Sequence, residues 1–116
     1  LLAGDAAHVN NPLGGMGMNG GVHDGVNVAK KLIQILNNGA SEDLLDLYDR
    51  QRRPIAIEYV QAQSIRNKKI MEEKDPAVRK QRQEEIKSLQ DDQQKSYELM
   101  MQASMINSIN KANAIT

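Results

Sequence analysis

The residues of this chain best suited to hold a ligand lie within its first nineteen positions. Asp5 supplies a carboxylate directly after a short run of apolar and small residues, and Pro12 and a glycine-rich loop around Gly14 follow. A helical pattern begins at about Met18. A helix start presents unpaired backbone N–H groups and the positive end of the helix dipole. The stretch therefore predicts a site for an anionic or oxygen-rich ligand.

A strand, a loop and a helix must position these groups. Residues 1–5 are typical of the end of a buried strand, and residues 6–17 are typical of a loop. In open α/β sheets, ligands bind just beyond the carboxyl ends of the strands. Glycine permits close backbone approaches there, and proline stiffens the loop. We therefore expect the Asp5 carboxylate and the Gly17 amide to converge on one cleft.

The first helix is predicted from about residue 18 to residue 37. Its apolar residues form one broad stripe, which indicates a helix buried within a larger body: Val22, Val26, Ala29, Ile33 and Leu36. Asn37, Asn38 and Gly39 provide a stop, because Asn and Gly tolerate the left-handed conformation at a helix end. The first 37 residues therefore predict a strand, a loop and one buried helix.

Three further helices are predicted downstream. Ser41 is suited to cap a helix that continues to about residue 69, with a kink or restart at Pro54. Asp75 followed by Pro76 predicts the start of a charged surface helix that ends near residue 90. A methionine-rich helix is then predicted over 97–109. The visible structure is thus expected to be mainly α-helical, with one short strand at 1–5.

Composition excludes several classes of protein. The 116 residues include 15 basic and 15 acidic side chains, so no excess charge indicates nucleic acid. There is no cysteine, which rules out disulfides and thiolate metal sites. No apolar run reaches the roughly 18 residues of a membrane span. We expect a cytoplasmic protein with neither a nucleic-acid partner nor a transmembrane segment.

The single strand candidate indicates a part of a longer protein. A strand needs partners for its N–H and C=O groups, and the sequence offers no second strand. We therefore expect a carboxyl-terminal fragment whose missing amino-terminal portion supplies a sheet. Residues 1–60 would complete one domain of the parent protein, and residues 61–116 would form a helical extension of it.

The opening stretch resembles a flavin-binding signature. The residues that carry the resemblance are Gly4-Asp5-Ala6-Ala7-His8, Pro12, Gly14-Gly15, Gly17-Met18-Asn19 and Asp24, with Arg52-Arg53-Pro54 downstream. This pattern is similar to that of the FAD-dependent aromatic-ring hydroxylases, the single-component flavoprotein monooxygenases typified by para-hydroxybenzoate and phenol hydroxylases. The resemblance implies an α/β parent with a Rossmann-like FAD-binding domain, of which this chain is a carboxyl-terminal fragment.

The resemblance also implies residue roles. Asp5 would accept a hydrogen bond from a ribityl hydroxyl of FAD. Gly17, Met18 and Asn19 would present backbone N–H groups to the flavin pyrimidine edge, with Gly14 in the same binding loop. Pro12 would lie beside the flavin ring and the substrate, and no residue is assigned as a catalytic acid or base. NADH or NADPH would reduce the flavin, which with O2 would hydroxylate an aromatic or similar small molecule.

Other interpretations remain open. The same scaffold could serve a flavin-dependent reductase, dehydrogenase or halogenase, and a helical interaction module is the alternative from another class. Asp5 alone could cap its own loop, whereas His8 and Asp24 are expected to be structural. The spacing of the histidines and aspartates matches no metal motif, so we predict no metal site. The arginines Arg50, Arg52 and Arg53 favour a solvated or domain-bridging ion pair over a phosphate clamp.

Overall fold

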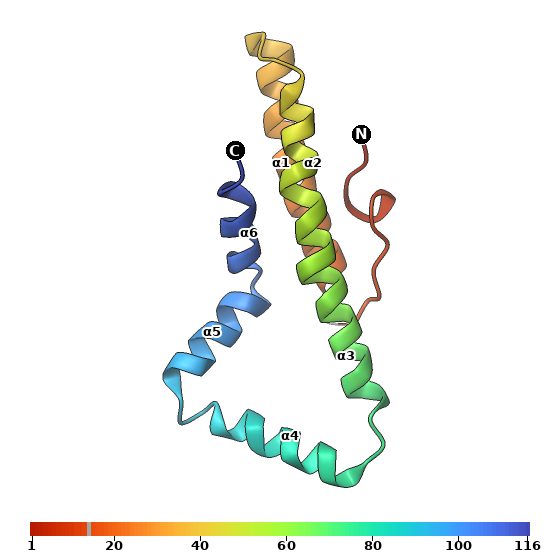
Figure 1. Cartoon of the computed structure of the whole chain (residues 1–116), viewed down its shortest axis with the longest axis vertical. Helices are drawn as coiled ribbons and strands as arrows, with labels where there is room; N and C mark the ends of the chain where they lie inside the picture. Colours follow the sequence, from red (N-terminus) through yellow and green to blue (C-terminus); the bar gives the residue numbers. More distant parts are fainter. Residues whose placement is uncertain (14) are drawn as a thin grey trace.

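The computed structural model describes residues 1–13 and 15–116 as a succession of helices (Figure 1). The elements are η1 (Gly4–Ala6), α1 (Met16–Asn38), α2 (Asp43–Ile55), η2 (Ala56–Gln61), α3 (Ala62–Glu72), α4 (Pro76–Ser88), α5 (Gln93–Ala103) and α6 (Ile106–Asn113). The radius of gyration is 17.5 Å, whereas a compact chain of this length has about 13 Å. The chain is therefore open, and α3, α4 and α5 form three sides of a frame (Figure 1).

The strand predicted at residues 1–5 is wrong for this chain. Residues 1–3 are irregular, and Gly4–Ala6 form the 3-10 turn η1, closed by the Ala7 and His8 amides, which donate to the Gly4 carbonyl at 2.8 and 3.0 Å. The described residues include no strand to pair with this segment. Because unpaired strand groups are unfavourable, the backbone satisfies itself locally.

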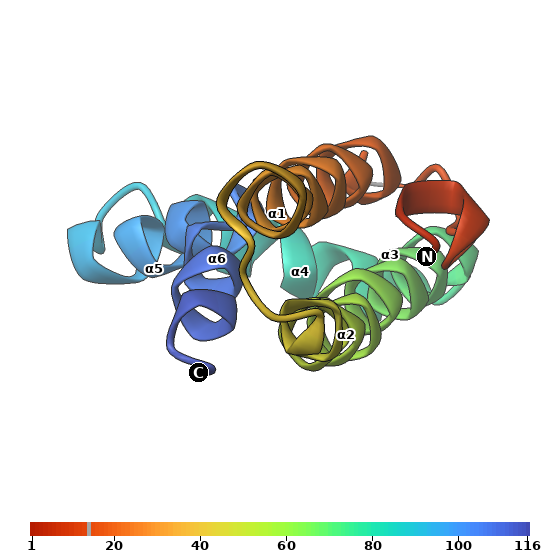
Figure 2. The same cartoon turned by 90° about the horizontal axis from the view of Figure 1, so that it is seen from above.

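Helices α1 and α2 form a hairpin and lie side by side (Figure 2). Gly39 ends α1 with a φ of 66°, as the Asn-Asn-Gly stop predicted. Ser41 contributes to the start of α2, because its Oγ accepts a hydrogen bond from the Asp43 amide at 3.2 Å. The seam between the two helices holds the side chains on which the site depends.

The apolar stripe of α1 faces solvent, contrary to the predicted burial. Val22, Val26, Ile33 and Leu36 are 51–77% exposed. The side chains that α1 buries against α2 include polar ones, Asp24 and Lys31. The stripe has no partner because the described residues contain no sheet or further layer to cover it. The outer face of α1 is thus suited to pack against a further apolar surface.

The helix that contains Pro54 changes its winding instead of ending. The π-helical segment η2 begins two residues after Pro54 and leads directly into α3. At its start, the Ala56 amide donates to the carbonyls of both Arg52 and Arg53. Proline lacks a backbone N–H, and a wider π turn is one way to accommodate the lost bond. The predicted disturbance at Pro54 is therefore present as a change of winding.

The C-terminal helices α4 and α5 begin at aspartate caps, of which Asp75 was predicted, and an unpredicted break follows α5. Asp75 accepts a hydrogen bond from the Ala77 amide at 2.8 Å, and Asp92 accepts one from the Lys95 amide at 3.0 Å. The single helix predicted over 97–109 is wrong, since α5 ends at Ala103 and α6 begins at Ile106. Met105 separates them with a φ of 62°, which directs α6 back towards α2.

Candidate functional site

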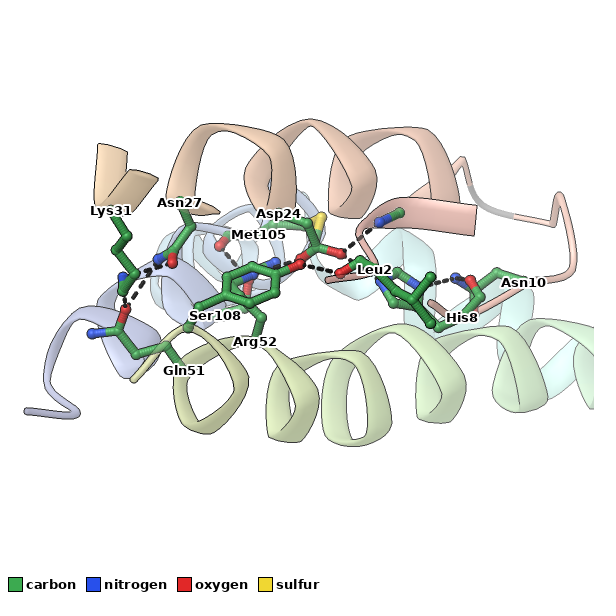
Figure 3. Close-up of polar contacts among 12 residues, drawn as sticks. Leu2, His8, Asn10, Asp24, Asn27, Lys31, Gln51, Arg52, Met105 and Ser108 are labelled. Carbon is green, nitrogen blue, oxygen red and sulfur yellow. Dashed lines mark hydrogen bonds and ion pairs between the residues drawn. The ribbon is translucent and has the colours of Figure 1, made fainter. Parts of the chain in front are cut away.

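Asp24 is the centre of a buried polar network that joins three segments (Figure 3). The carboxylate is 1% exposed. Its Oδ1 accepts a hydrogen bond from Arg52 Nε of α2 at 2.6 Å. Its Oδ2 accepts the Gly4 amide at 3.0 Å and lies 2.7 Å from His8 Nε2. The network therefore fastens the N-terminal segment to both α1 and α2.

The tautomer of His8 follows from its second partner. Asn10 Nδ2 lies 3.0 Å from His8 Nδ1 and 3.1 Å from the His8 carbonyl oxygen. An amide NH2 group only donates, so Nδ1 accepts and the ring proton resides on Nε2. His8 Nε2 therefore donates to Asp24. This confirms the interpretation of His8 as a hydrogen-bonded structural residue.

The electrostatics favour an ionised Asp24. Burial raises the pKa of this carboxyl group, but the hydrogen bonds from Arg52, His8 and the Gly4 amide outweigh burial and hold the pKa below its ordinary value. Asp24 is buried, and its charge is balanced by Arg52 and not by a helix start. Arg53 forms a solvated ion pair with Asp49, as expected, whereas the pair that Arg52 forms with Asp24 is buried between α2 and α1 and is neither solvated nor domain-bridging.

A close backbone contact sets the position of Asp5. Gly4 has a φ of 60°, and a Cβ atom added at Gly21 of α1 would lie 3.3 Å from the Gly4 Cα atom. Only glycine allows this approach without displacement. Beside it, Asp5 Oδ1 lies 3.9 Å from the place that a Cβ of Gly17 would occupy. The Asp5 carboxylate and the start of α1 therefore converge.

The predicted binding residues near the start of α1 differ in their exposure. Asp5 is exposed, and no hydrogen bond joins its carboxylate to another of the described side chains or amides. Met18 and Asn19 are exposed, and Gly17 is half-buried in the first turn of α1. The Pro12 carbonyl accepts the Gly15 amide at 3.1 Å, which closes a turn before α1. Gly14 lies outside the described residues.

A cavity of about 510 Å³ lies between the N-terminal segment and α2. Its walls include Leu2, His8, Tyr48 and Arg52, but neither Asp5 nor Gly17. Tyr48 donates a 2.7 Å hydrogen bond to the Leu2 carbonyl across it. Burial, followed by the charge of Asp24, raises the pKa of Tyr48. This cavity is thus separate from the point where Asp5 and α1 converge.

The seam also holds a buried lysine that the sequence analysis did not single out. Lys31 Nζ donates to Asn27 Oδ1 and to Gln51 Oε1, each at 2.7 Å. Gln51 Nε2 in turn donates to the Ile115 carbonyl at 2.7 Å. Burial, aided by the charges of Arg52 and Lys30, lowers the pKa of Lys31. Its position on the helix, one turn after Asn27, was the available signal.

The arrangement offers polar groups at a helix start that can bind a ligand. An exposed carboxylate suited to accept hydrogen bonds from hydroxyl groups lies beside the free amides that open α1. The Asp24 carboxylate, through the Gly4 amide and Arg52, holds the N-terminal segment against α1 and α2. Among the described residues, no group of three or more His, Asp or Glu side chains is arranged to hold a metal ion.

Comparison with known families identifies the class. Residues 1–63 match the model of a family described as "FAD binding domain". The match covers more than half of the chain, and the chain therefore belongs to this family of FAD-binding domains. No solved structure matches the chain significantly.

Several curated relatives are monooxygenases by name, and the chain matches each of them only in part. It is 46% identical over 79 residues to para-nitrophenol 4-monooxygenase of Pseudomonas sp. strain WBC-3, which covers 68% of this chain and 20% of that protein. It is 43% identical over 67 residues to 6-hydroxy-3-succinoylpyridine 3-monooxygenase HspB of Pseudomonas putida strain DSM 28022 / S16, covering 58% and 17%. It is 56% identical over 55 residues to 4-methyl-5-nitrocatechol 5-monooxygenase of a Burkholderia species, covering 47% and 10%.

The chain is much shorter than these relatives. It spans about a fifth or less of the length of these relatives. None of the helices formed by the described residues is long and apolar enough to cross a membrane.

Proposed function

We propose that this chain supplies the flavin-facing loop and helix of an FAD-dependent monooxygenase that hydroxylates an aromatic or similar small molecule. The single observation that carries the proposal is the convergence of the Asp5 carboxylate with the start of α1, where Asp5 Oδ1 lies 3.9 Å from the place that a Cβ of Gly17 would occupy. The relatives' names, all monooxygenases of ring compounds, support the reaction class. When bound, FAD would supply the oxygen-transfer chemistry, with NADH or NADPH as the reductant.

Each residue of the loop would have a binding role. Asp5 would accept a hydrogen bond from a ribityl hydroxyl, because its exposed carboxylate has no competing partner among the described residues. The amides of Gly17 and Met18, in the first turn of α1, would stabilise negative charge at the flavin pyrimidine edge, with Asn19 beside them in the same helix start. Pro12 would lie beside the flavin ring, and Gly14 would belong to the same loop.

The rest of the binding domain would be a separate portion of the parent protein. The exposed stripe of α1, with Met18 at 76% and Leu36 at 77% exposed, is suited to pack on an apolar sheet. We propose that an amino-terminal portion with a Rossmann-like sheet covers it. Residues 1–60 would complete that domain and residues 61–116 would extend it, in a cytoplasmic enzyme.

A chimera tests the binding role directly. The matching segment of para-nitrophenol 4-monooxygenase is replaced by this chain, and the FAD content of the purified protein is measured by its absorbance. We expect the chimera to retain FAD and Asp5→Ala to lower the occupancy several-fold, because one charge-assisted hydrogen bond is lost. Asp46→Ala, at an exposed position of α2, is the matched control. Equal occupancy in the Asp5 and Asp46 variants would remove Asp5 from the site.

The isolated chain provides a second test. We expect it to bind no stoichiometric FAD, because most of the cofactor site would lie in the amino-terminal portion. Purified chain with one flavin per molecule would contradict this division. Coupled oxygen consumption and substrate hydroxylation by the intact enzyme would distinguish the monooxygenase from a reductase, dehydrogenase or halogenase on the same scaffold.

A further inference from the structure

The segment between α5 and α6 packs beneath the start of α1. Met105 is 3% exposed and clusters with Met16, the first residue of α1, and with Val60 of η2. Met16 directly precedes Gly17, whose amide belongs to the proposed flavin site. A side chain from near the C-terminus thus belongs to the buried cluster at the first residue of α1.

The backbone at Met105 is fixed in an unfavourable conformation. Its φ of 62° lies in the left-handed region, which residues other than glycine rarely adopt. Ser108, which is fully buried, donates from Oγ to the Met105 carbonyl at 2.7 Å (Figure 3). Such conformations persist only where the surroundings determine them. The turn therefore holds the Met105 side chain in the cluster with Met16 and Val60.

The remainder of α6 is anchored independently of Met105. Gln51 Nε2 and Arg50 Nη1 of α2 donate to the carbonyls of Ile115 and Thr116 at 2.7 and 3.1 Å. Lys111 of α6 pairs with Glu58 of η2. Because these contacts hold α6 on α2 and η2, truncation of Met105 should free the start of α1 without releasing α6.

We propose that Met105 is a positioning residue for the flavin-binding start of α1. The match to the FAD-binding family ends at residue 63, so the C-terminal extension would contribute to the cofactor site from outside the matched region. Asn67 of α3 acts on the same loop, since its Nδ2 donates to the Leu13 carbonyl at 3.3 Å. The flavin role of this brace depends on the proposed function, whereas the brace itself does not.

Amide hydrogen exchange of the full chain tests the brace without flavin. In an α-helix that begins at Met16, the amides of Gly20 and Gly21 donate to the carbonyls of Met16 and Gly17. We expect Met105→Gly, which suits the left-handed backbone but removes the side chain, to lower protection at these amides about tenfold through local opening. Met105→Leu should restore protection, because it refills nearly the same volume. Met100→Ala, at a position 68% exposed on α5, is the control.

The pattern of exchange decides the question. A loss confined to the first turns of α1, with α2 and α6 still protected, supports the positioning role. An equal loss across all helices would make Met105 a general stability residue and overturn the proposal, as would unchanged protection at Gly20 and Gly21. A chimera that binds no FAD would defeat the proposed function but would leave this result intact.

Discussion

Arg52 of α2 and Asp24 of α1 form a buried ion pair, with Arg52 Nε 2.6 Å from Asp24 Oδ1 and both side chains at most 7% exposed. The same carboxylate accepts the Gly4 amide and the His8 ring. One charge pair in the helix seam therefore holds the segment that carries Asp5. The stability of the fold and the position of the site depend on the same atoms.

Removing the charge of Asp24 should destabilise the chain strongly. Asp24→Asn leaves Arg52 buried without a counter-ion, which typically costs about 3–5 kcal/mol of unfolding free energy. Urea unfolding followed by circular dichroism measures the loss, with Asp46→Asn at the surface as the control. The double variant Asp24→Asn/Arg52→Met should recover part of the stability. A loss below about 1 kcal/mol, the size of an ordinary substitution, would contradict the role of the pair.

The stability should fall in acid because of Asp24. Its folded-state pKa is lowered, so between that value and the unfolded value of about 3.9 the unfolded chain binds more protons. The contribution is therefore complete above the unfolded pKa and is lost as the pH falls through the folded pKa. Urea midpoints of the parent chain and of Asp24→Asn, measured from about pH 6 to pH 3, should approach each other in acid. Parallel pH profiles would exclude Asp24 as the titrating group.

Two glycines of α1 form a matched pair of tests. A Cβ at Gly25 meets nothing within 4 Å, so Gly25→Ala should raise the unfolding free energy by about 1 kcal/mol through helix propensity. A Cβ at Gly21 would press on the Gly4 backbone at 3.3 Å, so Gly21→Ala should gain less or lose stability. The amide NMR signals of Gly4 and His8 should shift only in Gly21→Ala. Equal stabilisation by both substitutions would show that the close contact is unimportant.

Replacing Gln51 should separate its two contacts. Gln51→Glu places a carboxylate beside Lys31 Nζ, so the lowered pKa of Lys31 should rise. The same change removes the donor to the Ile115 carbonyl, so protection of the α6 amides should fall. NMR titration of the lysine side chains measures the first effect, and hydrogen exchange measures the second. Gln83→Glu, exposed on α4, should do neither.

Features that depend on neighbouring residues were predicted more reliably than features that require a packing partner elsewhere in the structure. The stop at Gly39 and the cap at Asp75 depend on a few neighbouring residues, and the structure confirms both. The strand at 1–5 and the burial of the α1 stripe both required a second layer of structure, which the described residues do not contain. The left-handed turn at Met105 had no local signal, because methionine rarely adopts it.

The candidate site shows the same division. The proximity of Asp5 to a helix start was predicted from the order of residues, but Asp5 lies in the turn η1 and not at a strand end, and Gly17 lies within α1 and not in the preceding loop. The link between Asp24 and Arg52 was not, because 28 residues separate them and only the hairpin brings them together. Lys31 and Gln51 meet for the same reason.

Helix α4 contains no buried residue, yet it is the covalent route to α5 and α6. A protease cleaving at one of its basic residues would leave two pieces held together by the contacts of α6 with α2 and η2. The second piece would then be held by non-covalent contacts alone and could be removed from the first. A synthetic peptide of residues 89–116 could be added to the remainder at increasing concentration, so that the contribution of α5 and α6 to the structure could be titrated.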